Sequence, residues 1–187
     1  SRSASSSTAG TISCICRKRF DPLAHLTLMV GLPGSGKTTR ATILASETGA
    51  LRLTPDEWQT RLFDDDMHHP DHDRRHSTIE AIMWDITAHV LRSGGDVILD
   101  FGFWTRAERY DFAKKAAELG ATCRVQYDDV TLDELERRII ARNSIAGGHF
   151  AIPVDILRHW ATLFEAPGPD ELSGRFSASE FSAWDSR

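Results

Sequence analysis

The stretch Gly31-Leu32-Pro33-Gly34-Ser35-Gly36-Lys37-Thr38 contains a glycine, four further residues and then a Gly-Lys-Thr triplet. This is the spacing of a phosphate-binding loop. The apolar residues 26–30 before it favour a strand, and residues 39–45 after it favour a helix. The alternative is a glycine turn ahead of an ordinary helix. The strand–loop–helix context favours the phosphate-binding loop, and residues 31–38 are called the phosphate loop below.

Each part of the phosphate loop suits a nucleoside triphosphate such as ATP. The glycines let backbone N–H groups turn toward phosphate oxygens, and the helix N-terminus adds a partial positive charge. Lys37 can reach the β- and γ-phosphates, and Thr38 can place its hydroxyl on Mg2+. The residues expected to bind the nucleotide are Gly31, Pro33, Gly34, Ser35, Gly36, Lys37, Thr38 and Thr39.

The composition is that of an ordinary globular protein. The 187 residues suit one domain with a sizeable core, with 41% hydrophobic and 26% charged residues. The net charge of −5 argues against non-specific nucleic-acid binding as the main role. The apolar runs are too short to span a bilayer. Cys14, Cys16 and Cys123 form no disulfide framework, which favours the cytoplasm.

Three segments are predicted along the chain. Residues 1–24 are rich in serine, carry a basic cluster and contain few acids, so they are predicted to be a disordered extension or a cloning remnant. The same composition is also typical of a transit peptide. Residues 25–174 are predicted to form a single domain, and residues 175–187 a C-terminal tail.

Predicted strands and helices alternate from residue 26 onward, which indicates an α/β fold with a parallel sheet. A ligand is then expected at the carboxyl ends of the strands. The strands are predicted at residues 26–30, 49–54, 97–100 and 122–127, and the helices at residues 39–45, 54–63, 74–92, 105–119, 131–143 and 153–164.

Two further segments, residues 64–75 and 167–174, are predicted to be loops, and residues 147–150 a turn. Four histidines between residues 68 and 76 suggest either a metal site or a solvated loop that covers a substrate. The solvated loop is favoured because no strand or helix signal fixes the histidines as ligands.

Two aspartates follow predicted strands and so lie at the expected ligand edge of the sheet. Asp56 is either a base that accepts the proton of an attacking hydroxyl, which is favoured, or an acid that stabilises a helix N-terminus. Asp100 ends an apolar strand, where an acid that holds Mg2+ is expected. A helix-capping role is the alternative for Asp100.

Arginines and aromatic residues add charge and shape near this edge. Arg138 and Arg142 are four residues apart on a predicted helix, so they either clamp a migrating phosphoryl group or form a solvated face paired with acids. Residue spacing leaves both alternatives open. Residues 103–109, which include Trp104, Arg106 and Arg109, could shape or charge a substrate pocket, and ordinary packing is an equal alternative for Trp104.

Several segments together resemble the AAA_33-type P-loop kinases, relatives of polynucleotide 5′-kinases, zeta toxins and chloramphenicol phosphotransferase. The resemblance covers about residues 26–172. It is carried by the phosphate loop, residues 54–58 (TPDEW), residues 99–104 (LDFGFW), Arg138 with Arg142, and residues 164–167 (FEAP).

The resemblance implies a three-layer α/β/α P-loop NTPase fold like that of nucleoside-monophosphate kinases, with five parallel strands in the order 2-3-1-4-5. It also implies that Asp56 activates the acceptor and that Arg138 and Arg142 are lid arginines. The polynucleotide kinases of this lineage usually carry an arginine three residues beyond the acid. Gln59 stands at that position here, which weakens the case for a nucleic-acid substrate.

The function expected from these features is an ATP- and Mg2+-dependent kinase that phosphorylates a hydroxyl of a small molecule. Lys37, Asp56, Arg138 and Arg142 are its expected catalytic residues, and Thr38 and Asp100 its expected metal ligands. The two alternatives are a polynucleotide 5′-hydroxyl kinase and a switch protein that binds and slowly hydrolyses ATP.

Overall fold

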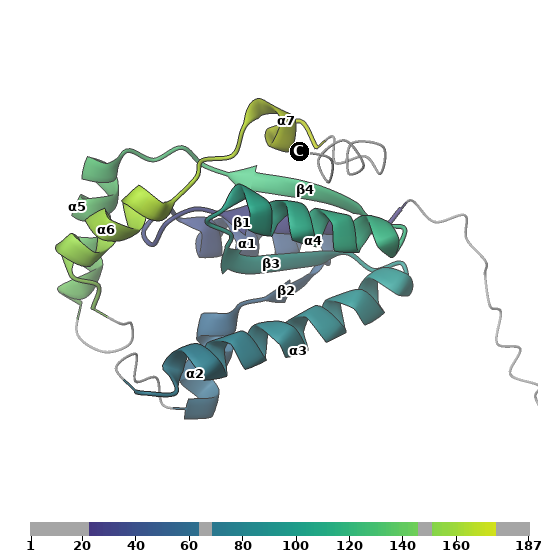
Figure 1. Ribbon diagram of the computed structural model, residues 1–187, viewed down its shortest axis with the longest axis horizontal. Helices are drawn as coiled ribbons and strands as arrows, with labels where there is room; N and C mark the ends of the chain where they lie inside the picture. Colours follow the sequence, from purple (N-terminus) through teal and green to yellow (C-terminus); the bar gives the residue numbers. More distant parts are fainter. Residues whose placement is uncertain (1–22, 64–68, 146–150, 175–187) are drawn as a thin grey trace, which may run out of the picture.

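The computed structural model describes residues 23–63, 69–145 and 151–174, in which four parallel strands form one sheet between helices (Figure 1). The strands are β1 (His25–Val30), β2 (Leu51–Leu53), β3 (Val97–Gly102) and β4 (Thr122–Tyr127). The helices are α1 (Lys37–Thr48), α2 (Pro55–Phe63), α3 (His72–Arg92), α4 (Arg106–Glu118), α5 (Leu132–Asn143), α6 (Val154–Leu163) and α7 (Pro169–Leu172).

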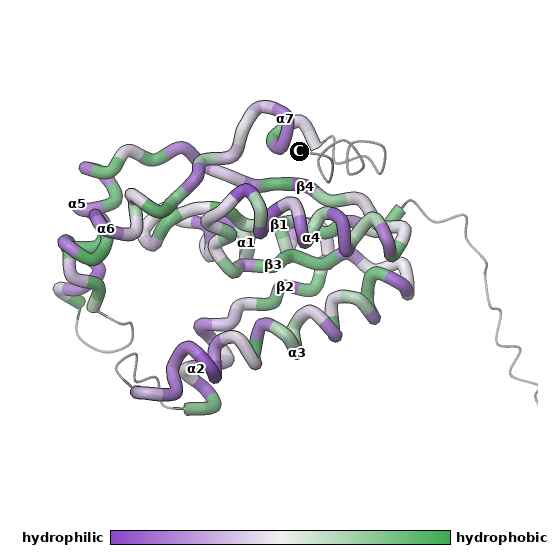
Figure 2. The backbone as a smooth tube through the Cα atoms, in the orientation of Figure 1, coloured by the Kyte–Doolittle hydropathy of each residue, from purple (hydrophilic) through white to green (hydrophobic). Residues whose placement is uncertain are grey.

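Alternating apolar residues bury both faces of the sheet. On β1, Leu28 and Val30 belong to the large core beneath α3 and α4, whereas Met29 packs with Ala41 of α1 on the other face. On β3, Ile98 joins that smaller core. A strand that is apolar on both sides must be covered on both sides, which gives three layers. Figure 2 shows the contrast between the hydrophobic central strands and the more hydrophilic α2.

The strand order β2-β3-β1-β4 agrees with the first four positions of the expected order 2-3-1-4-5. The expected fifth strand is absent from the three described ranges. At the outer side of β4 lies α7, which begins at Pro169 and packs against that strand (Figure 1). Proline has no N–H to donate to a neighbouring strand, so this segment favours a helical turn over a fifth strand.

Several element boundaries differ from the prediction. α3 begins at His72, two residues earlier than expected, so residues 72–75 are helical and do not belong to a loop. β3 continues to Gly102, two residues beyond Asp100. The short α7 lies within residues 167–174, which were expected to be a loop. Short-range signals fix element type better than element ends, because packing decides where an element stops.

Two arginines of the segment that was expected to shape a substrate pocket make contacts that serve the fold. Arg109 is buried, and its guanidinium donates to both carboxylate oxygens of Glu171 at 2.7 and 3.2 Å. It also donates to the carbonyl of Phe103, at 3.0 Å. Phe103 has φ of 46°, which is unusual for a bulky residue and needs outside support. Arg106 of α4 forms an ion pair with Asp170, which lies next to Glu171 on α7.

Several predictions lie outside the described residues. These concern residues 1–22 with Cys14 and Cys16, His68, the turn at 147–150 and the tail at 175–187.

Cys123 is a buried free thiol, and burial raises its pKa to about 12. Within the described part of the chain, no helix combines the length and the apolar character that a membrane crossing requires.

We expect Glu171→Gln to lower the free energy of unfolding by about 3–5 kcal/mol, because it leaves the charge of Arg109 buried without a counter-charge. Asp170→Asn is the matched control on the same helix. Its ion pair with Arg106 is solvent-exposed, so we expect a loss below about 1 kcal/mol. Urea unfolding of both variants measures the difference, and equal losses would contradict a structural role of the buried pair.

Candidate active site

Three glycines give the phosphate loop its shape. Gly31, Gly34 and Gly36 have φ of 145°, 86° and 93°, values that side chains with a Cβ rarely adopt. A Cβ on Gly31 would lie 2.7 Å from the Ser35 hydroxyl oxygen. Gly36 is the N-cap of α1, and the backbone N–H of Gly31 donates to the carbonyl of Gly102 at 3.0 Å. The loop is therefore fixed to the end of β3.

The other predicted nucleotide-binding residues lie in or directly after this loop. Pro33 is half-buried and Ser35 is buried. Lys37, Thr38 and Thr39 form the first turn of α1, where helix N–H groups are free to meet an anion. This arrangement is the anion-binding end of a helix following a strand.

Asp100 lies on the face of β3 that meets the start of α1. Alternation places it on the same side as Ile98, which packs with Ala41 of α1. The register between β1 and β3 then shifts by one residue before Gly102, an irregularity of the kind that re-aims side chains near sites.

The carboxylate of Asp100 is buried, and neither oxygen accepts a hydrogen bond from any described residue. Arg52 approaches Oδ2, at 3.9 Å. Burial raises the pKa of Asp100, and the charge of Lys37 and the nearby Thr38 hydroxyl oppose that rise. A buried acid with unused oxygens is costly unless a cation completes it.

Thr38 and Asp100 therefore fit a divalent cation. The cation would meet one hydroxyl and one carboxylate, oxygen ligands of the kind that Mg2+ prefers. Mg2+ usually takes only one or two protein oxygens together with water and phosphate oxygens, so this small donor set is sufficient. The two unused oxygens of Asp100 are the observation that supports the fit.

Asp56 lies in the first turn of α2 and opens onto solvent, with 78% of its side chain exposed. His76 lowers the pKa of Asp56 most, with its Nε2 at 3.5 Å from Oδ1, and the charge of Lys37 lowers it further. Lys37 thus acts on Asp56 and Asp100 together. A cation whose charge acts on both carboxylates, next to the phosphate loop, suits a phosphate group that lies between Asp56 and Asp100.

Arg138 pairs with an acid, which was one of the two alternatives, and also contacts the phosphate loop. Its Nε donates to Glu134 at 2.7 Å, as a helix-surface pair would. Its Nη1 also donates to the carbonyls of Gly34 and Ser35, at 3.2 and 3.4 Å. Arg138 is thus bound to the phosphate loop itself, and Glu134 is shared with Arg137.

Arg142, one turn further along α5, lies close enough to Asp56 for their charges to interact. Burial lowers the pKa of the Arg142 guanidinium, and the charge of Asp56 opposes that change. Its buried Nε has no hydrogen-bond partner among the described residues. The guanidinium therefore keeps donor capacity for an anion between α5 and α2.

Three residues at the site were missed by sequence reasoning. His76 and Glu80 lie on α3, four residues apart, and face Asp56. Both lie in the helix predicted over residues 74–92, but that prediction used only the spacing of its apolar residues. Arg52 precedes the strand end and pairs with Glu57 at 2.6 Å while approaching Asp100. A basic residue on a short half-exposed strand carries no signal by itself.

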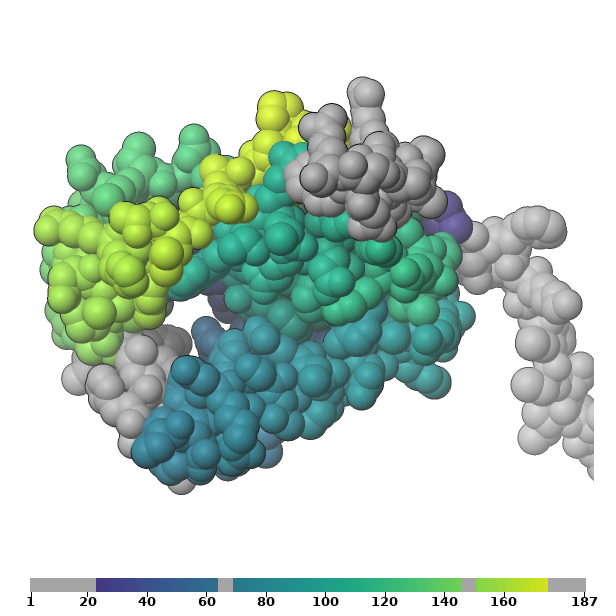
Figure 3. Space-filling model, in the orientation of Figure 1, coloured from purple at the N-terminus to yellow at the C-terminus, as the bar shows by residue number. Residues whose placement is uncertain are grey.

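Figure 3 shows the molecule hollowed between the region of α2 and α3 and the region of α5 and α6. The strand ends and the phosphate loop lie toward this side of the sheet (Figure 1). Asp56 belongs to α2 and Arg142 to α5, so the helices on the two sides of the hollow carry one acidic and one basic residue whose charges interact.

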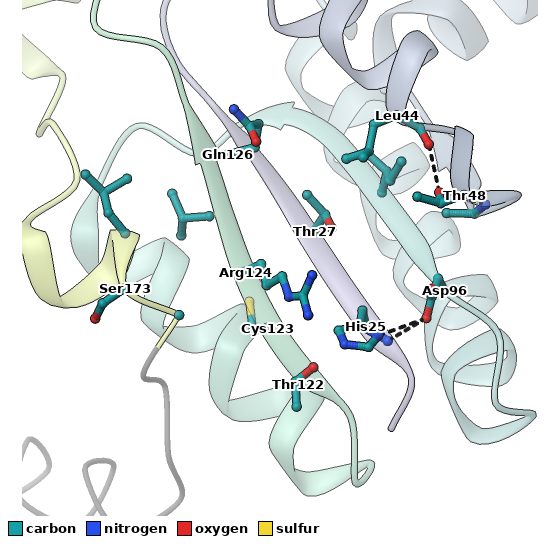
Figure 4. Close-up of a pocket in the computed structure, with 15 residues that line it drawn as sticks. His25, Thr27, Leu44, Thr48, Asp96, Thr122, Cys123, Arg124, Gln126 and Ser173 are labelled. Atoms are coloured by element: carbon teal, nitrogen blue, oxygen red, sulfur yellow. Dashed lines mark hydrogen bonds and ion pairs between the residues drawn. The ribbon is translucent and has the colours of Figure 1, made fainter. Parts of the chain in front are cut away.

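A separate pocket of about 610 Å3 lies over β1 and β4, between α1 and α7 (Figure 4). His25, Asp96 and Thr122 line it where three strands begin, at the opposite end of the sheet from the phosphate loop. Arg124 also borders the pocket. The pocket is therefore separate from the candidate active site.

A family model, AAA_33, described as an AAA domain, matches residues 26–167. No curated protein matches the chain. In the Pnkp1/Rnl/Hen1 RNA repair complex, one solved chain has a TM-score of 0.64 and 22% identity. That match covers 86% of this chain and 48% of the other, so this chain spans about half the length of that relative.

Two further solved structures are similar over most of both chains. A sugar kinase from Janibacter sp. HTCC2649 has a TM-score of 0.56 and 22% identity, covering 80% of this chain and 82% of that one. Chaetomium thermophilum Kti12 in complex with ADP-AlF3 has a TM-score of 0.59 and 19% identity, covering 77% and 82%. At these identities the likeness shows the fold, which is that of the P-loop kinases.

We expect Asp100→Asn to fold with unchanged or higher stability without nucleotide, because it removes a buried charge that accepts no hydrogen bond. The same variant should lose the Mg2+-dependent part of the stabilisation by ATP. A ligand at about 100 times its Kd stabilises a protein by about 2.7 kcal/mol, a readily measured rise in Tm. Thermal unfolding with ATP, with and without Mg2+, tests this, and an undiminished Mg2+ effect would contradict the metal role.

Proposed function

Because the chain belongs to the AAA_33 family of AAA domains, we propose that it is a kinase that uses ATP and Mg2+ to phosphorylate a hydroxyl of a small molecule. The observation that carries this proposal is the position of Lys37 in the first turn of α1, where its charge acts on two carboxylates, Asp56 and Asp100. The two acids differ in environment. One is buried and lacks hydrogen bonds, and the other is open to solvent.

This difference in environment supports different tasks for the two carboxylates. Asp100, buried beside Thr38, would hold the metal, which supplies charge neutralisation to the β- and γ-phosphates when bound. Asp56 is exposed and has a lowered pKa, so it is ionised at neutral pH and reachable by an acceptor. The phosphate loop and Lys37 would hold the phosphates in place.

In the proposed reaction the acceptor hydroxyl lies between Asp56 and the γ-phosphorus. Its oxygen forms the new bond to phosphorus, the bond from phosphorus to the ADP oxygen breaks, and the hydroxyl proton passes to an Asp56 oxygen. Arg142, on the opposite wall, would meet the charge on the moving phosphoryl group. Arg138, bound to the loop carbonyls, would join it once nucleotide is present.

The charges around the acceptor side favour an acceptor without negative charge. Glu80 faces Asp56, and burial together with the charges of Glu108 and Asp56 raises the pKa of Glu80. Asp56 is the exposed carboxylate of this group, and its charge disfavours a polyanion such as an oligonucleotide beside it. Gln59 is buried between α2 and α3 and contacts His72 at 3.2 Å, so it offers no cation to a nucleic-acid phosphate. We therefore favour a neutral or cationic polyol over a polynucleotide.

The experiment that tests this function is γ-phosphate transfer from labelled ATP with Mg2+. The acceptors are a panel of neutral, cationic and anionic hydroxyl compounds together with a 5′-hydroxyl oligonucleotide. Label on a neutral or cationic acceptor is the expected result. Label on the oligonucleotide alone would indicate a polynucleotide kinase, and free phosphate with every acceptor would indicate a hydrolysing switch.

We expect two substitutions to separate binding from transfer. Lys37→Ala should abolish turnover and weaken ATP binding, because the phosphates lose their cation. Asp56→Asn should keep ATP binding and lower kcat by about 100-fold to 10,000-fold, the usual contribution of a general base. Titration calorimetry with ATP and the transfer assay give the two readouts. Full transfer by Asp56→Asn would contradict the assignment of the base.

A further inference from the structure

His76 bridges two carboxylates that come from different helices. Its Nε2 lies 3.5 Å from Asp56 Oδ1 on α2, and its Nδ1 lies 3.5 Å from Glu80 Oε1 on α3. The imidazole is largely shielded, with 29% of the side chain exposed, whereas Asp56 is 78% exposed. The largely shielded imidazole therefore contacts the exposed Asp56 carboxylate on one side, and the rest of that carboxylate stays accessible to solvent.

We propose that His76, supported by Glu80, is a positioning residue that fixes the Asp56 carboxylate for proton abstraction. This inference rests on the proposed function, since it concerns the base of that reaction. An exposed aspartate in the first turn of a helix can adopt several rotamers. A contact from the neighbouring helix selects one of them, and reactions of this kind need the base within hydrogen-bonding reach of the hydroxyl.

The support from Glu80 follows from helix geometry. Residues four apart on a helix lie on the same face, so Glu80 sits beside the ring one turn along α3. With one imidazole nitrogen turned to Glu80, the other is directed to Asp56. His72 stacks near His76, with ring centroids 6.2 Å apart, and is itself tied to Gln59 of α2 at 3.2 Å. Two links thus hold α2 against α3 at the base.

The surrounding charges favour the protonated ring. The contact with Asp56 raises the pKa of His76 most, burial opposes this, and the charges of Glu80 and Asp73 raise it further. On the other side, Lys37 of α1 and Arg142 of α5 act on Asp56. A raised pKa means that the ring keeps its charge to a higher pH than an ordinary histidine and loses it as the pH rises through the folded value. The hold on Asp56 should therefore weaken on the alkaline side.

The test combines a titration that needs no acceptor with kinetics that do. NMR of the His76 ring in the full chain should give a pKa above the ordinary value of about 6.5. That pKa should fall in Asp56→Asn and in Glu80→Gln. His89→Gln, a change at an exposed histidine near the other end of α3, is the matched control and should leave the His76 titration unchanged.

In the transfer assay, His76→Gln should lower kcat by about 10-fold to 100-fold, the range seen when a group that orients a functional residue is lost. The KM for ATP should stay unchanged, because the phosphate loop is intact. Glu80→Gln should move the alkaline fall of kcat to lower pH. A purely structural role of His76 would not produce this shift.

Two outcomes would overturn the inference. One is a His76 ring that titrates at its ordinary value irrespective of Asp56→Asn. The other is wild-type kcat and pH profile in His76→Gln. If the wild-type chain transferred phosphate to no acceptor, the positioning role would fall together with the proposed function. The titration would then show separately whether the pairing of His76 with Asp56 exists.

Discussion

Neighbouring strands of a parallel sheet end at the same edge, so the pairing of β1 with β3 brings the loops that follow them together. Gly31 and Gly102 meet there through a hydrogen bond of 3.0 Å. The phosphate loop continues from β1, and Asp100 lies just before the end of β3. The carboxylate therefore reaches the start of α1 because of strand pairing, and Thr38 and Lys37 meet it there. The rest of the candidate site is arranged around this junction.

The helices then supply the groups that face the junction from two sides. α2 and α3 bring Asp56 with His76, and α5 brings Arg138 and Arg142. The carboxylate at the junction is buried and the one on α2 is exposed, which supports the proposal that one holds the metal and the other accepts a proton. The environment of each acid therefore carries more functional information than its residue type.

The sequence predicted the phosphate loop, the parallel α/β fold and the four strands, because these follow from local signals. A glycine pattern between strand and helix fixes backbone geometry, and apolar runs fix burial. Arg109 contacts Glu171, which is 62 positions away, and His76 contacts Asp56, which is 20 positions away. A local sequence pattern does not indicate pairs that are so far apart in the chain. The expected substrate-pocket role of Arg109 failed for this reason. A fifth strand was expected from resemblance, whereas α7 lies against β4 here.

A crystal structure of the chain with Mg2+ and a non-hydrolysable ATP analogue would test the proposed roles of Asp56 and Asp100 most directly. We expect Mg2+ about 2.0–2.1 Å from the Thr38 hydroxyl oxygen, with Asp100 as a ligand or one water away. We also expect the γ-phosphate between Lys37 and Asp56, with room for an acceptor beside Asp56. A γ-phosphate directed away from Asp56, or a metal that does not engage Asp100, would contradict these roles.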